Sequence, residues 1–356
     1  MEKIKNIEML RFLFSLSIVC VHFKNMLKDF SNQIPFYKDF IEGLTFGHIP
    51  VWFFFIIAGF FFFWKTDFNQ DFITFAKKKL IRFMPVILFT LLLCFVASLF
   101  TSYPFLKYEN IFTLLCLQNT GLTFHNGNVG VSWFVSSLFW TMAFYFYLYK
   151  CVNRKMFNLI TACIVFFCNA MIVHLPSISV VKNTYYVINS GMLIGFANVG
   201  LGYFMAMIYT NNIDKIKNLT LKWWQTLLCT AAEIYLFCFL FYYMCFHKLH
   251  YNNILIFILA FVGLFGLFVV KKGWLSKLLE NNFSVFFGQF AFSIYITHYL
   301  VKDLWTILVC KPHGQWVLAH PYANILIPFS IMILLGVTAF YLVEKPAAKY
   351  LKKLSL

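Results

Sequence analysis

Residues 4–23 have the sequence IKNIEMLRFLFSLSIVCVHF. About 20 mostly apolar residues suffice to cross a bilayer as an α-helix, yet this run contains Arg11 and His22, and ionisable side chains are costly inside a membrane. Glu8, Arg11, Ser15 and His22 fall on one stripe of such a helix, because its period is about 3.6 residues. We therefore predict a membrane helix that turns a polar seam toward other helices.

The composition of the 356-residue chain excludes an ordinary soluble domain. Hydrophobic residues make up 61% and charged residues 12%, whereas soluble proteins carry about 25% charged residues. The net charge of +16 does not indicate nucleic-acid binding, because the basic residues lie between the apolar runs and form no base-reading motif. The ten cysteines lack metal-type spacing, so we expect neither a metal site nor a disulfide framework.

Hydropathy predicts an all-α polytopic membrane protein with one domain over residues 1–356. We expect about ten transmembrane helices, at 7–27, 48–64, 83–103, 129–149, 157–175, 190–209, 223–245, 252–270, 285–309 and 322–343. An even number places both termini on one side, and that side carries 21 of the 29 Lys and Arg residues. The positive-inside rule makes it cytoplasmic. No cleavage site follows the first run, which we expect to remain as a helix.

The long outer connections are predicted at 28–47 and 104–128. The second contains a short apolar piece, Ile111–Leu117, which cannot span a bilayer. We expect this piece to be interfacial or re-entrant.

His22 and Arg11 each admit two interpretations. A lone intramembrane histidine often hydrogen-bonds between helices, whereas a neutral imidazole in a wet cavity can act as a general base. Arg11 lies about one turn inside the predicted cytoplasmic boundary, so it can reach the lipid headgroups. It can also hold an anionic or carbonyl group of a ligand that enters from the cytoplasm. The shared polar seam favours the functional interpretation of His22.

Residues 77–85, KKKLIRFMP, are dense in cations and are predicted to connect the second and third spans. Their charge can serve membrane topology and headgroup contact. Alternatively, this connection forms a site for a phosphorylated ligand, for which coenzyme A is well suited.

The later spans contain further polar residues. Tyr295 and His298 are three residues apart and share a helix face, and His298 is predicted at nearly the depth of His22. Either a shared cavity or a polar packing contact accounts for this match. Glu233 lies near the middle of the seventh span, where a carboxylate needs a partner or a proton. Trp133, at the outer end of the fourth span, is also typical of an interfacial aromatic belt.

The second span ends with the phenylalanine-rich run 53–60. Its aromatic side chains are typical of lipid-facing positions, and Gly59 would allow another helix to approach closely.

Taken in order, these features resemble the acyltransferase-3 family of bacterial integral-membrane acyltransferases. Each match is weak alone, but the ordered set is fairly specific. The matching features are Arg11-x10-His22, the phenylalanine-rich run ending at Gly59, Arg82-x-x-Pro85, Trp133, Ser293-x-Tyr295-x-x-His298 and Glu344-x-Pro346.

The resemblance implies a ten-helix domain of the bacterial inner (cytoplasmic) membrane. It would transfer an acyl group, usually acetyl, from cytoplasmic acyl-CoA to a hydroxyl of a cell-envelope glycan or lipid-linked sugar. Acyl-CoA is then a co-substrate and no cofactor is expected. The other expected partners are the glycan acceptor and membrane lipids, and nucleic acid is not among them.

The resemblance also assigns roles to residues. His22 would be the catalytic residue and Arg11 its motif partner, while Arg82 belongs to the family's R-x-x-R pair. We expect acyl-CoA to contact Lys79, Arg82 and Tyr295. Candidate members of the acceptor site, or of the layer of residues behind it, are Trp133, His298 and Glu233.

The chain departs from the family pattern at two places. Lys79 replaces the first arginine of R-x-x-R and cannot form the same bidentate contact. Many members also carry a glutamate about five residues after the fourth-span tryptophan, where this chain has Ser136-Ser137-Leu138. We find no hydrolase-like C-terminal extension and expect the short, stand-alone form.

The rival hypothesis is a secondary transporter or flippase of an anionic or glycan-linked lipid, since a polar seam can line a translocation path. The chain shows neither an internal repeat nor a pair of Gly/Pro-broken helices, which are typical of such transporters. For the acyltransferase, direct transfer and an acyl-imidazole intermediate on His22 are both open. The acceptor sugar, the acyl group and the oligomeric state leave no readable pattern.

Overall fold

The computed structural model describes residues 4–43, 49–122, 127–174, 184–185, 188–246 and 254–354. Parts of both long outer connections lie outside these residues, as do the ends of three predicted spans, at 48, 175 and 252–253. Lys3, Lys182 and Lys248 of the charge count also lie outside them.

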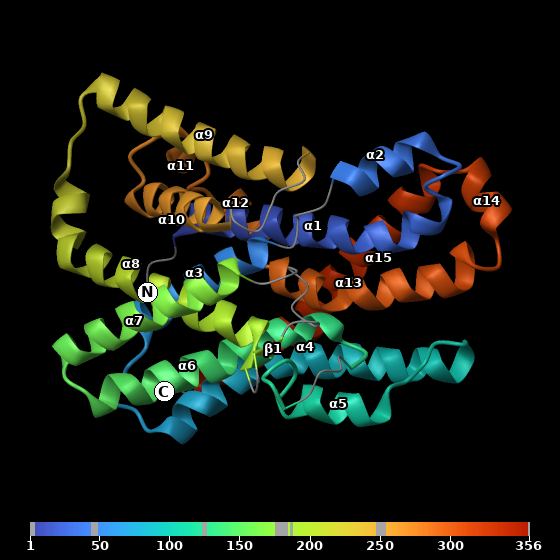
Figure 1. The fold of residues 1–356 in the computed structure, drawn as a ribbon, viewed down its shortest axis with the longest axis horizontal. Helices are drawn as coiled ribbons and strands as arrows, with labels where there is room; N and C mark the ends of the chain where they lie inside the picture. Colours follow the sequence, from blue (N-terminus) through green and yellow to red (C-terminus); the bar gives the residue numbers. More distant parts are fainter. Residues whose placement is uncertain are drawn as a thin grey trace.

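The described chain is helical, as predicted, and β1 and β2 add one two-residue antiparallel ladder. Figure 1 shows the long helices roughly parallel to one another along the horizontal axis. The helices and strands are α1 (Lys5–Leu27), α2 (Pro35–Gly43), α3 (Pro50–Lys65), α4 (Phe72–Phe100), α5 (Lys107–Leu114), α6 (Trp133–Cys151), α7 (Arg154–Val173), β1 (Thr184–Tyr185), β2 (Ile188–Asn189), α8 (Ser190–Asn218), α9 (Trp223–Phe246), α10 (Ile254–Val270), α11 (Trp274–Leu278), α12 (Asn282–Gly288), α13 (Ala291–Trp305), α14 (Gly314–Ala319), α15 (Ala323–Ala339) and α16 (Lys345–Leu354). Short 3₁₀ turns precede α2 (Lys28–Phe30) and α6 (Gly130–Ser132), and π-helical turns follow α13 (Thr306–Cys310) and α15 (Phe340–Glu344).

Each of the ten predicted spans corresponds to a helix in the structure. Eight helical segments of the described chain are long and apolar enough to cross a membrane, and α3 and α10 are shorter apolar helices. The number of spans and the side of the termini stay predictions.

Burial separates inner helices from outer ones. In the apolar windows of α1, α6, α8 and the α12–α13 segment, 56–72% of residues are buried, against 17–28% in α4, α7, α9 and the segment that starts with α15. A helix that is apolar yet poorly buried by protein is covered by lipid in a membrane. The inner helices therefore form the interior that can hold a polar site.

The third span begins earlier than predicted, at Phe72 instead of residue 83. Asp71 caps the helix by accepting hydrogen bonds from the Thr74 backbone N–H (2.9 Å) and hydroxyl (2.6 Å), and these bonds lower the pKa of its carboxyl. Pro85 lies inside α4 instead of opening it. The cationic segment 77–82 is therefore helical, which places Lys79 and Arg82 about one turn apart.

The phenylalanine-rich run on α3 is more buried than predicted. Phe53 and Phe55 are fully buried in the protein and do not face lipid. Gly59 does allow a close approach, because a Cβ atom there would lie 2.5 Å from the backbone oxygen of Val199 on α8. The contact between α3 and α8 is the most extensive between helices in the described chain.

The N-terminal end of α1 is tied to the segment between α10 and α12. The Asn6 side chain donates to the backbone oxygens of Phe268 (2.8 Å) and Ser276 (3.0 Å). The Asn6 backbone N–H donates to Glu280 (3.0 Å), which also pairs with Lys271 (2.8 Å). Buried polar groups with several partners position a helix firmly, so α1 has a defined register.

At the other end of the bundle, α5 is held by a reciprocal pair of asparagines. Asn128 Oδ1 accepts from the side chain of Asn110 and the backbone N–H of Leu106, both at 2.8 Å. In return, the Asn128 N–H donates to Asn110 Oδ1 (2.8 Å), and the Asn128 amide donates to the Pro104 oxygen (2.7 Å). The connection between α4 and α6 is therefore ordered over its described part.

Candidate active site

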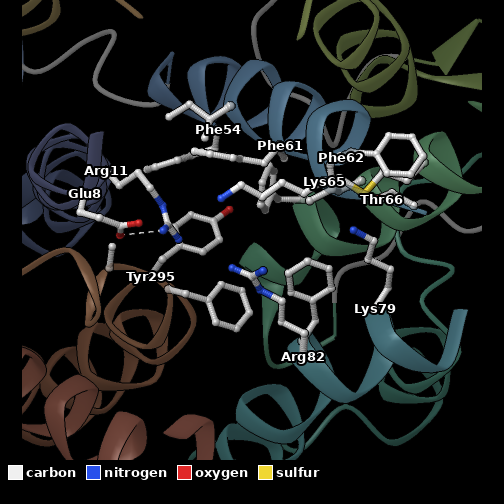
Figure 2. A pocket seen from close by; sticks show the side chains of 18 of the residues that line it. Glu8, Arg11, Phe54, Phe61, Phe62, Lys65, Thr66, Lys79, Arg82 and Tyr295 are labelled. Carbon is white, nitrogen blue, oxygen red and sulfur yellow. Dashed lines mark hydrogen bonds and ion pairs between the residues drawn. The ribbon is translucent and has the colours of Figure 1, made fainter. Parts of the chain in front are cut away.

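Two cavities lie at opposite ends of α1. The inner cavity, of about 420 Å³, opens near the start of α1 and the end of α3, and Figure 2 shows its side chains. The outer cavity, of about 1060 Å³, lies between the end of α1, the segment after α4 and the end of α13. Both volumes are typical of small-molecule sites. In the predicted topology the inner cavity faces the cytoplasm.

Several cations line the inner cavity. Its positively charged lining residues are Arg11, Lys65, Lys79 and Arg82. In the described part of the chain, no carboxylate forms an ion pair with Lys79 or Arg82, and the Lys79 ammonium lies 5.3 Å from the centre of the Phe62 ring. Figure 2 shows the charged ends of these side chains pointing into one space. Cations grouped in this way favour an anionic ligand.

Two acidic residues modulate this charge. Glu8 pairs with Arg11 at 2.8 Å, one turn away on α1. Glu344, at the end of the π-helical turn, accepts a 2.5 Å hydrogen bond from the Ser293 hydroxyl and interacts electrostatically with Arg82 and Arg11. Glu8 thus orients the Arg11 guanidinium, and the cavity keeps an excess of positive charge.

The remaining lining of the inner cavity is largely apolar. It includes Phe134, Leu138, Met142 and the ring of Tyr295. A ligand with an anionic head and a less polar arm matches this combination of cationic and apolar lining.

The outer cavity combines aromatic and polar side chains. Among its lining residues are His22, Tyr103, Asn128, Trp133, Tyr299, Asp303 and Lys311. Aromatic faces beside hydrogen-bonding groups are typical of sites for polar organic ligands.

A thin septum separates the two cavities, which share no lining residue. The Tyr295 hydroxyl, from the inner side, donates a 3.0 Å hydrogen bond to the backbone oxygen of Val131, which lines the outer side. Trp133 and Phe134 are consecutive residues of α6 but line opposite cavities. The Tyr295 ring and the backbone of the segment before α6 therefore form part of this barrier.

His298 is buried beside the septum, with its ring centroid 5.0 Å from that of His22 and 5.9 Å from that of Tyr295. The structure thus brings into contact the two histidines that the sequence placed at nearly the same depth, although only His22 lines the outer cavity.

The sequence-predicted site residues fall into three groups. Arg11, Lys79, Arg82 and Tyr295 line the inner cavity, and His22 and Trp133 line the outer one. Glu233 lines neither cavity. Its carboxylate accepts a 3.1 Å hydrogen bond from the Ser276 backbone N–H and packs against Gly273, so it contacts the segment around α11.

Sequence reasoning missed several lining residues. Lys65 could have been found, because it lies in the same predicted boundary region as Arg82, and Glu8 was placed on the polar seam but given no role in the site. Asp303, Tyr299 and the Asn128 loop carry no motif, and the fold alone places them at the outer cavity. The described residues contain no cluster of three His, Cys, Asp or Glu side chains that could hold a metal ion.

The sequence was compared with models of known protein families. The sequence model of the acyltransferase domain, acyltransferase-3, matches residues 4–344, nearly the whole chain. This chain belongs to the acyltransferase-3 family. Membership and the apolar helices together make this acyltransferase-3 protein a multi-pass membrane acyltransferase. No curated protein and no solved structure is similar enough to give a match.

Proposed function

We propose that this protein is an O-acyltransferase of the bacterial inner membrane. It moves an acyl group, most simply acetyl, from cytoplasmic acyl-CoA to a hydroxyl of a cell-envelope glycan or lipid-linked sugar. The observation that carries the proposal is the pair of cavities at opposite ends of α1, separated beside His22 by a thin septum. Such an arrangement suits two substrates that arrive from opposite sides of a membrane.

The inner cavity is the proposed donor site. Lys79 and Arg82 hold the coenzyme phosphates, and Arg11 lies where the arm that carries the thioester enters. Lys79 supplies a point charge where the family has a bidentate guanidinium, so Arg82 makes the more directional contact. The thioester end reaches the apolar wall at Tyr295 and Phe134.

The outer cavity is the proposed acceptor site. A sugar can lay its apolar ring face on Trp133 or Tyr299 and direct hydroxyls toward Asp303 and Asn128. Arg11 and His22 lie eleven residues apart on the continuous helix α1, a separation of about 16 Å along its axis. The reacting hydroxyl and thioester therefore meet near His22 when the Tyr295 ring leaves the septum.

In the proposed step His22 acts as a general base. It takes the proton of the acceptor hydroxyl while the oxygen forms a bond to the acyl carbon. The carbon–sulfur bond breaks, and the proton passes from His22 to the departing thiolate, which leaves ester and free coenzyme A. A positioned base is worth about 10²–10⁴-fold in rate. The alternative route forms an acyl-imidazole intermediate on His22. It would be favoured if, without acceptor, labelled acyl group remains on the wild-type protein and is absent from His22→Ala.

The proposal is tested by the O-acyl content of envelope glycans, measured by NMR of extracted polysaccharide. A deletion strain is compared with strains complemented by wild type or by His22→Ala at equal expression. We expect ester signals with wild type only, and the shifted sugar protons identify the acceptor hydroxyl. Full restoration by His22→Ala would exclude the catalytic role. Unchanged acylation with altered glycan export would favour a transporter or flippase.

A further inference from the structure

The His298 ring is held in one tautomer. Its Nδ1 atom lies 2.6 Å from the backbone oxygen of Tyr295, one turn earlier on α13. A carbonyl oxygen can only accept a hydrogen bond, so Nδ1 carries the hydrogen. In the neutral ring the second nitrogen, Nε2, is then an acceptor with a free lone pair.

That lone pair is buried without a donor. His298 has no exposed surface, and its Nε2 atom has no hydrogen-bond partner in the described part of the chain. Leaving a buried acceptor unsatisfied costs about 1–3 kcal/mol. An unsatisfied group beside a reaction site therefore calls for an explanation, and the neighbouring side chains supply one.

His22 is positioned to provide the donor. Its ring is perpendicular to that of His298, at 86°, with centroids 5.0 Å apart. The rings meet edge to face and His298 Nε2 has no partner among the described residues in this arrangement, so the hydrogen bond forms only when the His22 ring turns. His22 lines the outer cavity whereas His298 does not. A substrate can therefore touch His22, and His298 can act only through it.

The charged neighbours on α13 are already engaged with one another. The Lys302 ammonium lies 2.8 Å from Asp303 Oδ1 and 3.6 Å from the centre of the Tyr299 ring. Asp303 in turn lines the outer cavity. Lys302 is thus engaged by Asp303 and the Tyr299 ring, and in the described chain His298 Nε2 remains the unsatisfied buried acceptor next to His22.

We propose that His298 is a positioning residue, which accepts a hydrogen bond from one N–H of His22 at Nε2 and so turns the other His22 nitrogen toward the acceptor hydroxyl. The inference rests on the proposed function, because it assigns a support to the base of that reaction. His298 takes up no proton. It orients the His22 ring and stabilises the positive charge that His22 carries between taking the hydroxyl proton and releasing it to the thiolate.

The test compares His298→Leu, which removes the acceptor, with His298→Gln, which supplies an amide oxygen in its place. Full-length protein in membranes is assayed with labelled acetyl-CoA and polysaccharide extracted from the deletion strain. Loss of an orienting partner typically costs roughly 10–100-fold. We expect His298→Leu to lower kcat by about that factor with an unchanged KM for acetyl-CoA, and His298→Gln to recover most of the loss.

Three results would overturn the inference while the proposed function stands: full activity of His298→Leu beside an inactive His22→Ala, equal impairment of the Gln and Leu variants, or a change confined to KM. Full activity of His22→Ala would instead overturn the proposed function itself. Thermal unfolding in detergent checks the fold of each variant. If His298→Leu unfolds early, His298→Met serves as the second variant without an acceptor nitrogen.

Discussion

The cations that line the inner cavity lead to a prediction about the donor. If Lys79 and Arg82 bind phosphate, replacing them by alanine must weaken the binding of acetyl-CoA but not the binding of a thioester that lacks the nucleotide. S-acetylpantetheine is such a donor, because it keeps the thioester and its arm without the adenosine phosphates. Lys77 provides the matched control, since it carries the same charge on the same helix but does not line the cavity.

The size of the effect follows from the surroundings of the two side chains. A hydrogen bond to a charged partner contributes about 1.5–3 kcal/mol, and each 1.4 kcal/mol is about a factor of ten in affinity. Arg82 is exposed toward the cavity and Lys79 is half-buried, so water weakens both contacts and the low end of the range applies. We expect KM for acetyl-CoA to rise about 10-fold in each single variant and about 100-fold in the double variant.

The assay measures acyl transfer in membranes at several donor concentrations, with both donors and at low and high salt. The expected result is a raised KM for acetyl-CoA, little change for S-acetylpantetheine, and a smaller difference at high salt. Lys77→Ala should behave as wild type. Equal loss with both donors would refute the phosphate-binding role, and so would an equal effect of Lys77→Ala.

Three further predictions concern stability and the outer cavity. Gly59→Ala should lower the free energy of unfolding by about 1–3 kcal/mol or more, because its Cβ would meet the backbone of Val199. The control is Gly266→Ala, whose Cβ would lie 3.7 Å from a methionine methyl group. Equal unfolding temperatures of the two variants in detergent would contradict the packing argument. Burial alone would raise the pKa of Glu280, but hydrogen bonds from Lys271 and the α1 backbone lower it below 4.5. The ionised Glu280 therefore stabilises the fold above that pH, and this stabilisation is lost as the pH falls through the lowered pKa. Glu280→Gln should accordingly flatten the acid limb of a plot of unfolding temperature against pH. Asn128→Ala removes the hydrogen bonds that hold the connection between α4 and α6, so it should speed proteolysis there. It should also raise KM for the polysaccharide and leave KM for acetyl-CoA unchanged, because Asn128 lines the outer cavity. The opposite pattern of KM values would show that Asn128 does not belong to the acceptor site.

Local patterns predicted much of the fold. Apolar runs located a helix for every predicted span, because burial in lipid acts on each segment separately. The start of α4 was placed too late, at residue 83. Hydropathy locates the point where charged residues give way to apolar ones, whereas the helix itself begins at the cap residue Asp71. The buried Phe53 and Phe55 were missed because a phenylalanine facing protein and one facing lipid look alike in sequence.

For the site, the sequence by itself determined the residue types and their spacing along each helix. The periodicity of α1 placed Glu8, Arg11 and His22 on one seam, and the ordered motifs pointed to the family that the domain match shows. Only the tertiary structure decided that this seam is shared between two cavities, that His298 meets His22, and that Glu233 binds the segment around α11. The physical reason is that spacing within a helix follows from backbone geometry alone, whereas contacts between helices depend on how distant segments pack.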